Sequence, residues 1–145
     1  MAAARVAEMM KEQNREVEKW AVLPRPLGSA RIWEVIISSK SGVSMMDICT
    51  VPCPGIEKNM IPILASAPRS EVVTRASTTE SAAALLRFAR FPVTRIEELP
   101  SGYRVTLIES RFYRPDVKRA LAAEITLDQS LQVVRENLSF DQSVK

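Results

Sequence analysis

Pairs of apolar, β-branched segments joined by short turns constrain the fold of this 145-residue chain more than any other feature. There are three such pairs: residues 31–38 with 43–51, 91–99 with 103–111, and 121–127 with 131–140. The intervening residues are rich in Ser, Gly, Pro and Asp, which favour tight turns. Because consecutive hairpins favour an antiparallel arrangement, the sequence predicts an α+β fold with an antiparallel β-sheet of about five to seven strands.

Two helices are predicted beside this sheet. Residues 3–20 contain no Gly or Pro and carry a mainly apolar stripe at spacings of three and four, formed by Val6, Met9, Met10, Gln13, Val17 and Trp20. The stripe predicts an N-terminal amphipathic helix that packs on a core or on a partner helix, with a membrane-surface face as the alternative, and a homo-oligomer could form through it. A shorter helix is predicted to begin at a capping box of Ser77 and Glu80 and to end near Arg90, because Pro92 cannot continue it.

The predicted domain organisation is an amphipathic or linker helix over 1–22, followed by a single α+β domain over 23–145. Residues 56–66 stay ambiguous, since Pro62 interrupts their apolar run and allows either a short strand or an irregular buried stretch. No segment approaches the roughly 20 apolar residues that cross a bilayer. Residues 1–15 carry charges in place of the apolar stretch of a secretory signal. The chain on its own is therefore expected in the cytoplasm.

Histidine is absent from the chain, which limits its chemistry. The absence excludes Ser-His and Cys-His nucleophile pairs and histidine zinc sites, and leaves only carboxylate-based or lysine-based mechanisms. Cys49 and Cys53 lack the second pair of ligands that a closed zinc site needs. They are predicted to be half-buried free thiols near a turn, with a local disulfide as the alternative. The sequence predicts no catalytic residue, no metal site and no cofactor.

A few residues could carry chemistry without histidine: Glu97, Glu98, Glu109, Lys58 and Lys118. General acid–base catalysis needs a cleft and a partner group, and the sequence indicates neither. The three carboxylates are therefore predicted to be solvated turn and strand residues. Neither lysine shows the buried, desolvated setting that a nucleophilic lysine requires.

Basic residues are concentrated in one part of the chain. The whole chain has a formal charge of +3, and residues 69–119 hold ten basic and six acidic residues, which gives +4. An excess of this size does not predict a nucleic-acid partner. Seven arginines could form a patch for phosphates or anionic head groups, or could solvate both faces of the sheet: Arg87, Arg90, Arg95, Arg104, Arg111, Arg114 and Arg119. We single out Arg90, Arg104 and Arg111 as candidate contacts to an anion or a partner.

Three short motifs resemble a known family. They are an R-F-x-R-F-P segment, a G-Y-x-V strand and an acidic-x-Arg-aromatic strand end, preceded by a tryptophan in the first strand. The residues concerned are Trp33, Phe88, Arg90, Phe91, Pro92, Gly102, Tyr103, Glu109, Arg111 and Phe112. Together they resemble the C-terminal region of the inner-membrane-bound metal-dependent hydrolase family of bacteria, over residues 23–140. The family usually has Asn-Pro at Gly28 and Ser29, and Asp-Leu at Glu109 and Ser110.

The resemblance implies an extramembrane accessory or interaction domain of such a hydrolase. The family's hydrolase assignment rests on histidine and acidic residues of its membrane portion, so it implies no catalytic residue in this chain. The implied partners are that membrane portion or an anionic lipid surface, which would place the longer protein at the membrane. The alternative from the residues alone is a pocket for a small apolar ligand between a helix and a curved sheet.

Overall fold

The computed structural model describes residues 4, 7, 8, 17–24, 31–49, 51, 61–113 and 117–144. The chain divides into two compact units, Met1–Leu64 and Ala65–Lys145, whereas the sequence predicts one domain over 23–145. The predicted α+β class is confirmed. The prediction of one sheet of five to seven strands is wrong, because the described strands form two antiparallel sheets of four strands each.

The first sheet has the strand order β1-β2-β3-β4. Its strands are β1 (Lys19–Pro24), β2 (Ile32–Ser39), β3 (Gly42–Cys49) and β4 (Ile61–Ala65). The predicted hairpin of β2 and β3 is confirmed, with Ser39 opposite Gly42. Alternate residues share one face in such a pair, so Val35, Ile37, Met46 and Ile48 form a buried apolar cluster.

The predicted N-terminal helix differs from the structure at its end. Ala4, Ala7 and Glu8 are helical, and the rest of residues 3–16 lies outside the described residues. Trp20, however, lies in β1, where it pairs with Ile37 of β2. Strand pairing at the edge of a sheet therefore overrides the local helix propensity at this point. In the ambiguous stretch, the strand alternative is correct for 61–65.

Cys49, the last residue of β3, is buried and disulfide-bonded. The prediction of a free thiol is wrong for this residue, and the disulfide alternative applies to it. Cys53 lies outside the described residues. Spacing did not decide between the two states, because disulfide formation depends on the directions of the Cβ atoms.

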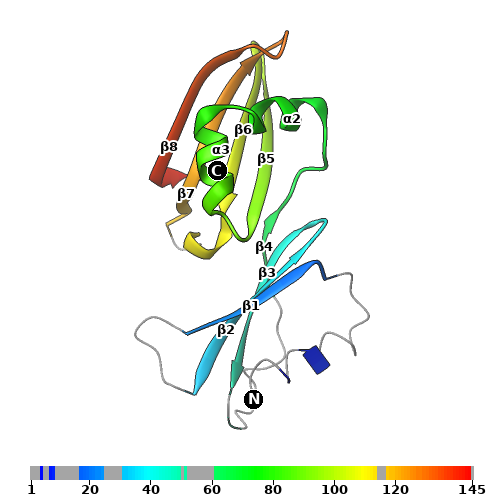
Figure 1. Ribbon diagram of the computed structural model, residues 1–145, viewed down its shortest axis with the longest axis vertical. Helices are drawn as coiled ribbons and strands as arrows, with labels where there is room; N and C mark the ends of the chain where they lie inside the picture. The colour runs from blue at the N-terminus through cyan, green and yellow to red at the C-terminus, as the bar shows by residue number, and fades with distance from the viewer. Residues whose placement is uncertain are drawn as a thin grey trace. The chain divides into compact units, whose positions relative to one another are not determined.

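The second unit places two helices on one face of an antiparallel meander (Figure 1). Its elements are α2 (Glu71–Ser77), α3 (Glu80–Phe88), β5 (Pro92–Leu99), β6 (Gly102–Glu109), the 3₁₀ turn η1 (Ser110–Phe112), β7 (Arg119–Asp128) and β8 (Val133–Ser143). The strand order is β5-β6-β7-β8, so the two predicted C-terminal hairpins are confirmed. Helix α2 was not predicted, because its seven residues are too few for a clear periodicity.

The core of this unit lies between the helices and the sheet. Leu85 of α3 packs with Val105 of β6 and Ile125 of β7, and none of the three is more than 2% exposed. Every second residue of β6 and β7 faces this core, since side chains alternate along a strand. The intervening residues form the opposite face of the sheet, which we call the open face.

The start of α3 corrects the predicted capping box. Ser77 is the last residue of α2, and its hydroxyl donates to the carbonyl of Val73 at 2.7 Å. The N-cap of α3 is Thr79, whose Oγ1 accepts a hydrogen bond from the backbone N–H of Ala82 at 3.4 Å. A carboxylate does serve this end of the helix, but it belongs to Glu136 of β8 and accepts from Ser81 N. The N-terminus of α3 is therefore capped in part by a side chain from a distant part of the chain.

Thr79→Ala is expected to lower the free energy of unfolding by about 1 kcal/mol, because the buried hydroxyl also donates to Ala76 O. Ser77→Ala removes only a hydroxyl bonded to the preceding turn and is expected to change stability by less than about 0.5 kcal/mol. Urea unfolding followed by far-UV circular dichroism measures both. Equal losses in the two variants would contradict the assignment of Thr79 as the cap.

Candidate functional site

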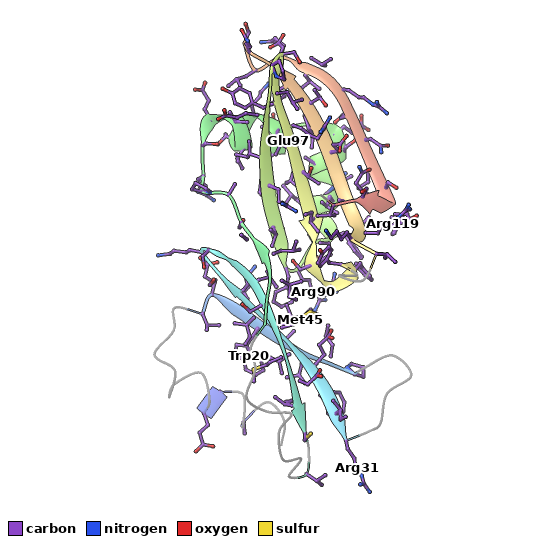
Figure 2. The ribbon with its side chains drawn as sticks, turned by 180° about the vertical axis from the view of Figure 1, so that it is seen from behind. Trp20, Arg31, Met45, Arg90, Glu97 and Arg119 are labelled. Atoms are coloured by element: carbon purple, nitrogen blue, oxygen red, sulfur yellow. The ribbon has the colours of Figure 1, made fainter. Side chains whose placement is uncertain are left out.

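The structure separates the three arginines that the sequence singled out. Arg90 follows α3 and Arg111 lies in η1, while Arg104 lies on β6 directly opposite Glu97 of β5. Figure 2 shows Arg90 and Glu97 at opposite ends of the sheet. Arg104 Nη1 donates to Glu97 Oε2 at 2.6 Å. Arg90 and Arg111 are therefore neighbours of one site, and Arg104 belongs to another.

Glu109, the last residue of β6, organises the first site. Its side chain is fully buried, and its Oε2 accepts from the backbone N–H groups of Arg90 and Phe91. Its Oε1 accepts from the backbone N–H and the Nε–H of Arg111, at 3.1 and 3.0 Å. The carboxylate thus ties the turn after α3 to η1. The prediction that Glu109 is solvated is wrong, because strand alternation places it on the core side with Val105 and Leu107.

Two exposed aromatic rings lie beside this carboxylate. Phe88 and Phe112 are 52% and 46% exposed, and their rings stack with centroids 5.9 Å apart. The guanidinium carbon of Arg111 lies 5.4 Å from the Phe88 centroid and 5.3 Å from that of Phe112. Since Glu109 holds Arg111, this partly buried ion pair also holds the rings in place. We call Phe88, Arg90, Arg111 and Phe112 the aromatic–arginine surface.

Phe91 and Pro92 complete the motif around this surface. Phe91 is buried, and its carbonyl accepts from the backbone N–H and the hydroxyl of Ser110 at 3.1 and 2.8 Å. Pro92, the first residue of β5, lies opposite Glu109. The first and third motifs of the resemblance therefore meet at one end of the sheet. The sequence motif joined Glu109, Arg111 and Phe112, but sequence reasoning did not place Phe88 beside them.

The remaining motif residues lie elsewhere. Gly102 and Tyr103 begin β6 at the hairpin end, and Tyr103 packs against the core beneath the helices. Trp33 lies on β2 in the Met1–Leu64 unit and packs against its apolar cluster. Its indole N–H is buried without an acceptor among the described residues. Tyr103 and Trp33 therefore contribute to the packing of their own units.

The other predicted basic residues do not form one patch with the surface. Arg119 pairs with Asp141, Arg95 lies on the open face opposite Thr106, and Arg87 is exposed in the last turn of α3. Arg114 lies outside the described residues. The fold therefore places these charged residues in separate parts of the second unit.

The open face carries a cavity of about 480 Å³ within the second unit. Its polar lining comes from all four strands and includes Arg95, Glu97, Arg104, Thr106, Glu124 and Gln142. Sequence reasoning missed Thr106, Glu124 and Gln142, because only the strand register places them beside the two arginines.

The remaining candidates for chemistry are Glu97, which also lines the cavity, and Glu98, Lys58 and Lys118. Glu97 and Glu98 are exposed on β5, as predicted, and Lys118 is exposed at a residue with φ of 51°. Lys58 lies outside the described residues. Within the described part of the chain, no group of three Cys, Asp or Glu side chains is arranged to hold a metal ion. None of the helices described there has the length and apolar character needed to cross a membrane.

Comparison with known proteins adds no relative. No protein-family model, no curated protein and no solved structure matches this chain significantly.

Proposed function

We propose that residues 65–145 form a non-catalytic interaction domain that docks on an anionic lipid surface through the aromatic–arginine surface. The observation that carries the proposal is the pair of stacked, half-exposed rings of Phe88 and Phe112 against Arg111. Leaving two large aromatic side chains in water is unfavourable, so such a patch usually marks a contact site. The partly buried ion pair with Glu109 fixes the rings before any partner binds, which lowers the entropic cost of docking.

The charges near the rings favour an anionic partner. Arg90, a member of the surface, is exposed and makes no ion pair with the described residues. The Glu109 carboxylate is buried, so it does not repel anions approaching the surface. Exposed rings combined with cations are typical of proteins that bind anionic head groups.

The sequence resemblance supports a membrane context for this domain. Two of its motifs, at residues 87–92 and 109–112, supply the residues of the aromatic–arginine surface, as a shared docking role would require. On this proposal the domain is the extramembrane accessory domain of a bacterial membrane-bound metal-dependent hydrolase, and the membrane next to that protein is its partner.

The alternative of a small apolar ligand between helices and sheet has less support. Leu85, Val105 and Ile125 fill that side of the sheet, and the cavity of the second unit lies on the opposite, polar face.

Flotation of the whole chain with liposomes at low salt tests the lipid proposal. Binding to anionic vesicles is expected to exceed binding to neutral ones. The double variant Phe88→Ser with Phe112→Ser is expected to weaken anionic binding at least about tenfold, because each ring contributes about 1.5 kcal/mol or more when buried. Arg90→Gln is expected to weaken it about fivefold.

Phe140→Ser is the matched control, because Phe140 of β8 is 82% exposed and lies outside the aromatic–arginine surface. Its binding should equal that of the wild type. Equal binding to anionic and neutral vesicles would remove the lipid proposal. An equal loss in Phe140→Ser and the double variant would show nonspecific adhesion.

A further inference from the structure

A row of three residues crosses the open face of the β5–β8 sheet. Arg95 of β5 lies directly opposite Thr106 of β6, and Thr106 lies directly opposite Glu124 of β7. Residues opposite one another in an antiparallel pair point to the same face. The row therefore has a cation at one end, a short side chain in the middle and an anion at the other end.

The short central side chain leaves a hollow. All three residues line the cavity of about 480 Å³, a volume in the usual range for small-molecule sites. The outer strands of a three-strand row lie about 9.6 Å apart, so the Arg95 and Glu124 side chains can reach a small molecule over Thr106. Residues 142–144 form another wall, and Val144 is held by a hydrogen bond from its N–H to Lys118 O at 2.8 Å.

The polar groups of the cavity are only partly satisfied. Arg104 is bound to Glu97, but its Nε atom is buried without a hydrogen-bond acceptor and lies 3.8 Å from Glu124 Oε2. Arg95 makes no ion pair or side-chain hydrogen bond within the described part of the chain. Glu124 accepts one hydrogen bond, from Gln142 Nε2 at 3.2 Å, and a carboxylate has room for several.

We infer that this cavity binds a small zwitterion, whose anionic group contacts Arg95 and the Nε–H of Arg104 and whose ammonium group contacts Glu124. Guanidinium groups bind carboxylates and phosphates well, and a buried N–H without an acceptor gains most from a new one. The two arginines and two glutamates of the lining cancel in charge, so a net-neutral ligand fits better than a simple anion. An amino acid and a phosphoethanolamine head group share this chemistry. The inference uses no residue of the aromatic–arginine surface and does not depend on the proposed docking.

Nuclear magnetic resonance titration of the ¹⁵N-labelled whole chain tests the inference with four probes: glycine, glycerophosphoethanolamine, acetate and methylammonium. At least one zwitterion is expected to shift the Arg104 Nε–Hε signal and the Thr106 amide signal with a dissociation constant of about 1 mM or lower. Acetate and methylammonium are expected to bind at least about tenfold more weakly, since each makes only one of the two charge contacts. The stronger of the two zwitterions identifies the anionic group that the cavity prefers.

Arg95→Gln is expected to raise the dissociation constant about tenfold. Arg135→Gln is the matched control, because Arg135 lies on the open face opposite Thr126 but does not line the cavity. Both arginines are exposed, so the spectra should show both variants folded. Two results would overturn the inference: no shift with either zwitterion at a concentration about ten times the expected dissociation constant, or acetate binding as tightly as the stronger of the two zwitterions.

Discussion

Replacing Glu109 with glutamine is expected to lower the free energy of unfolding of the 65–145 unit by about 3 kcal/mol. The carboxylate accepts hydrogen bonds from the backbone N–H groups of Arg90, Phe91 and Arg111 and from the Arg111 guanidinium, and it is fully buried. In glutamine one of the two oxygens becomes an NH₂ group, which cannot accept a hydrogen bond. Either the N–H groups of Arg90 and Phe91 or the donors of Arg111 then lose their acceptor, and the Arg111 charge loses its counter-ion. Breaking one side of a buried ion pair costs far more than removing an exposed one.

Amide hydrogen exchange in β6 and β7 measures this loss. Tryptophan fluorescence would report on the other unit, since Trp20 and Trp33 both lie within Met1–Leu64. Glu98→Gln is the matched control, because Glu98 is exposed on β5, and it should change stability by less than about 0.5 kcal/mol. Similar exchange rates for Glu109→Gln and Glu98→Gln would contradict the structural role assigned to Glu109.

Gly102→Ala is expected to destabilise the same unit by about 3 kcal/mol or more. Gly102 has φ of +146°, which residues with a side chain rarely adopt, and an added Cβ would lie 2.1 Å from the backbone oxygen of Leu127. The obstructing atoms belong to the backbone of β7, so no side-chain rotation relieves the overlap. The β6–β7 pairing would have to open at this end of the sheet.

Ser101→Ala, in the same turn, is the control for Gly102→Ala. Ser101 is exposed and its φ is not positive. The free energy of unfolding of Ser101→Ala should therefore stay within about 0.5 kcal/mol of the wild-type value. Hydrogen exchange of amides in β6 and β7 separates the two variants. A wild-type exchange pattern in Gly102→Ala would mean that the hairpin can shift its register without loss, contrary to the close approach described above.

The candidate sites were predictable to different degrees. Arg90 and Arg111 were singled out from their charge and their motifs and lie at one site, whereas Arg104 lies on the open face with Glu97. The aromatic–arginine surface depends on Glu109, whose position in the strand alternation indicated burial, although a lone carboxylate is normally read as solvated. The Arg95–Thr106–Glu124 row could not be predicted, because it depends on the pairing register of three strands.

Local signals in the sequence determined three hairpins and the end of one helix, because these depend on residues that are close together in the chain. The hairpins β2–β3, β5–β6 and β7–β8 follow from alternating apolar residues and turn residues, and the end of α3 follows from Pro92. Only the tertiary structure decided that the strands form two sheets, that Trp20 belongs to a strand, and that the Glu109 carboxylate binds the turn after α3. The physical reason is that turns and periodicity act within a few residues, whereas strand partners and burial depend on groups brought together from distant parts of the chain.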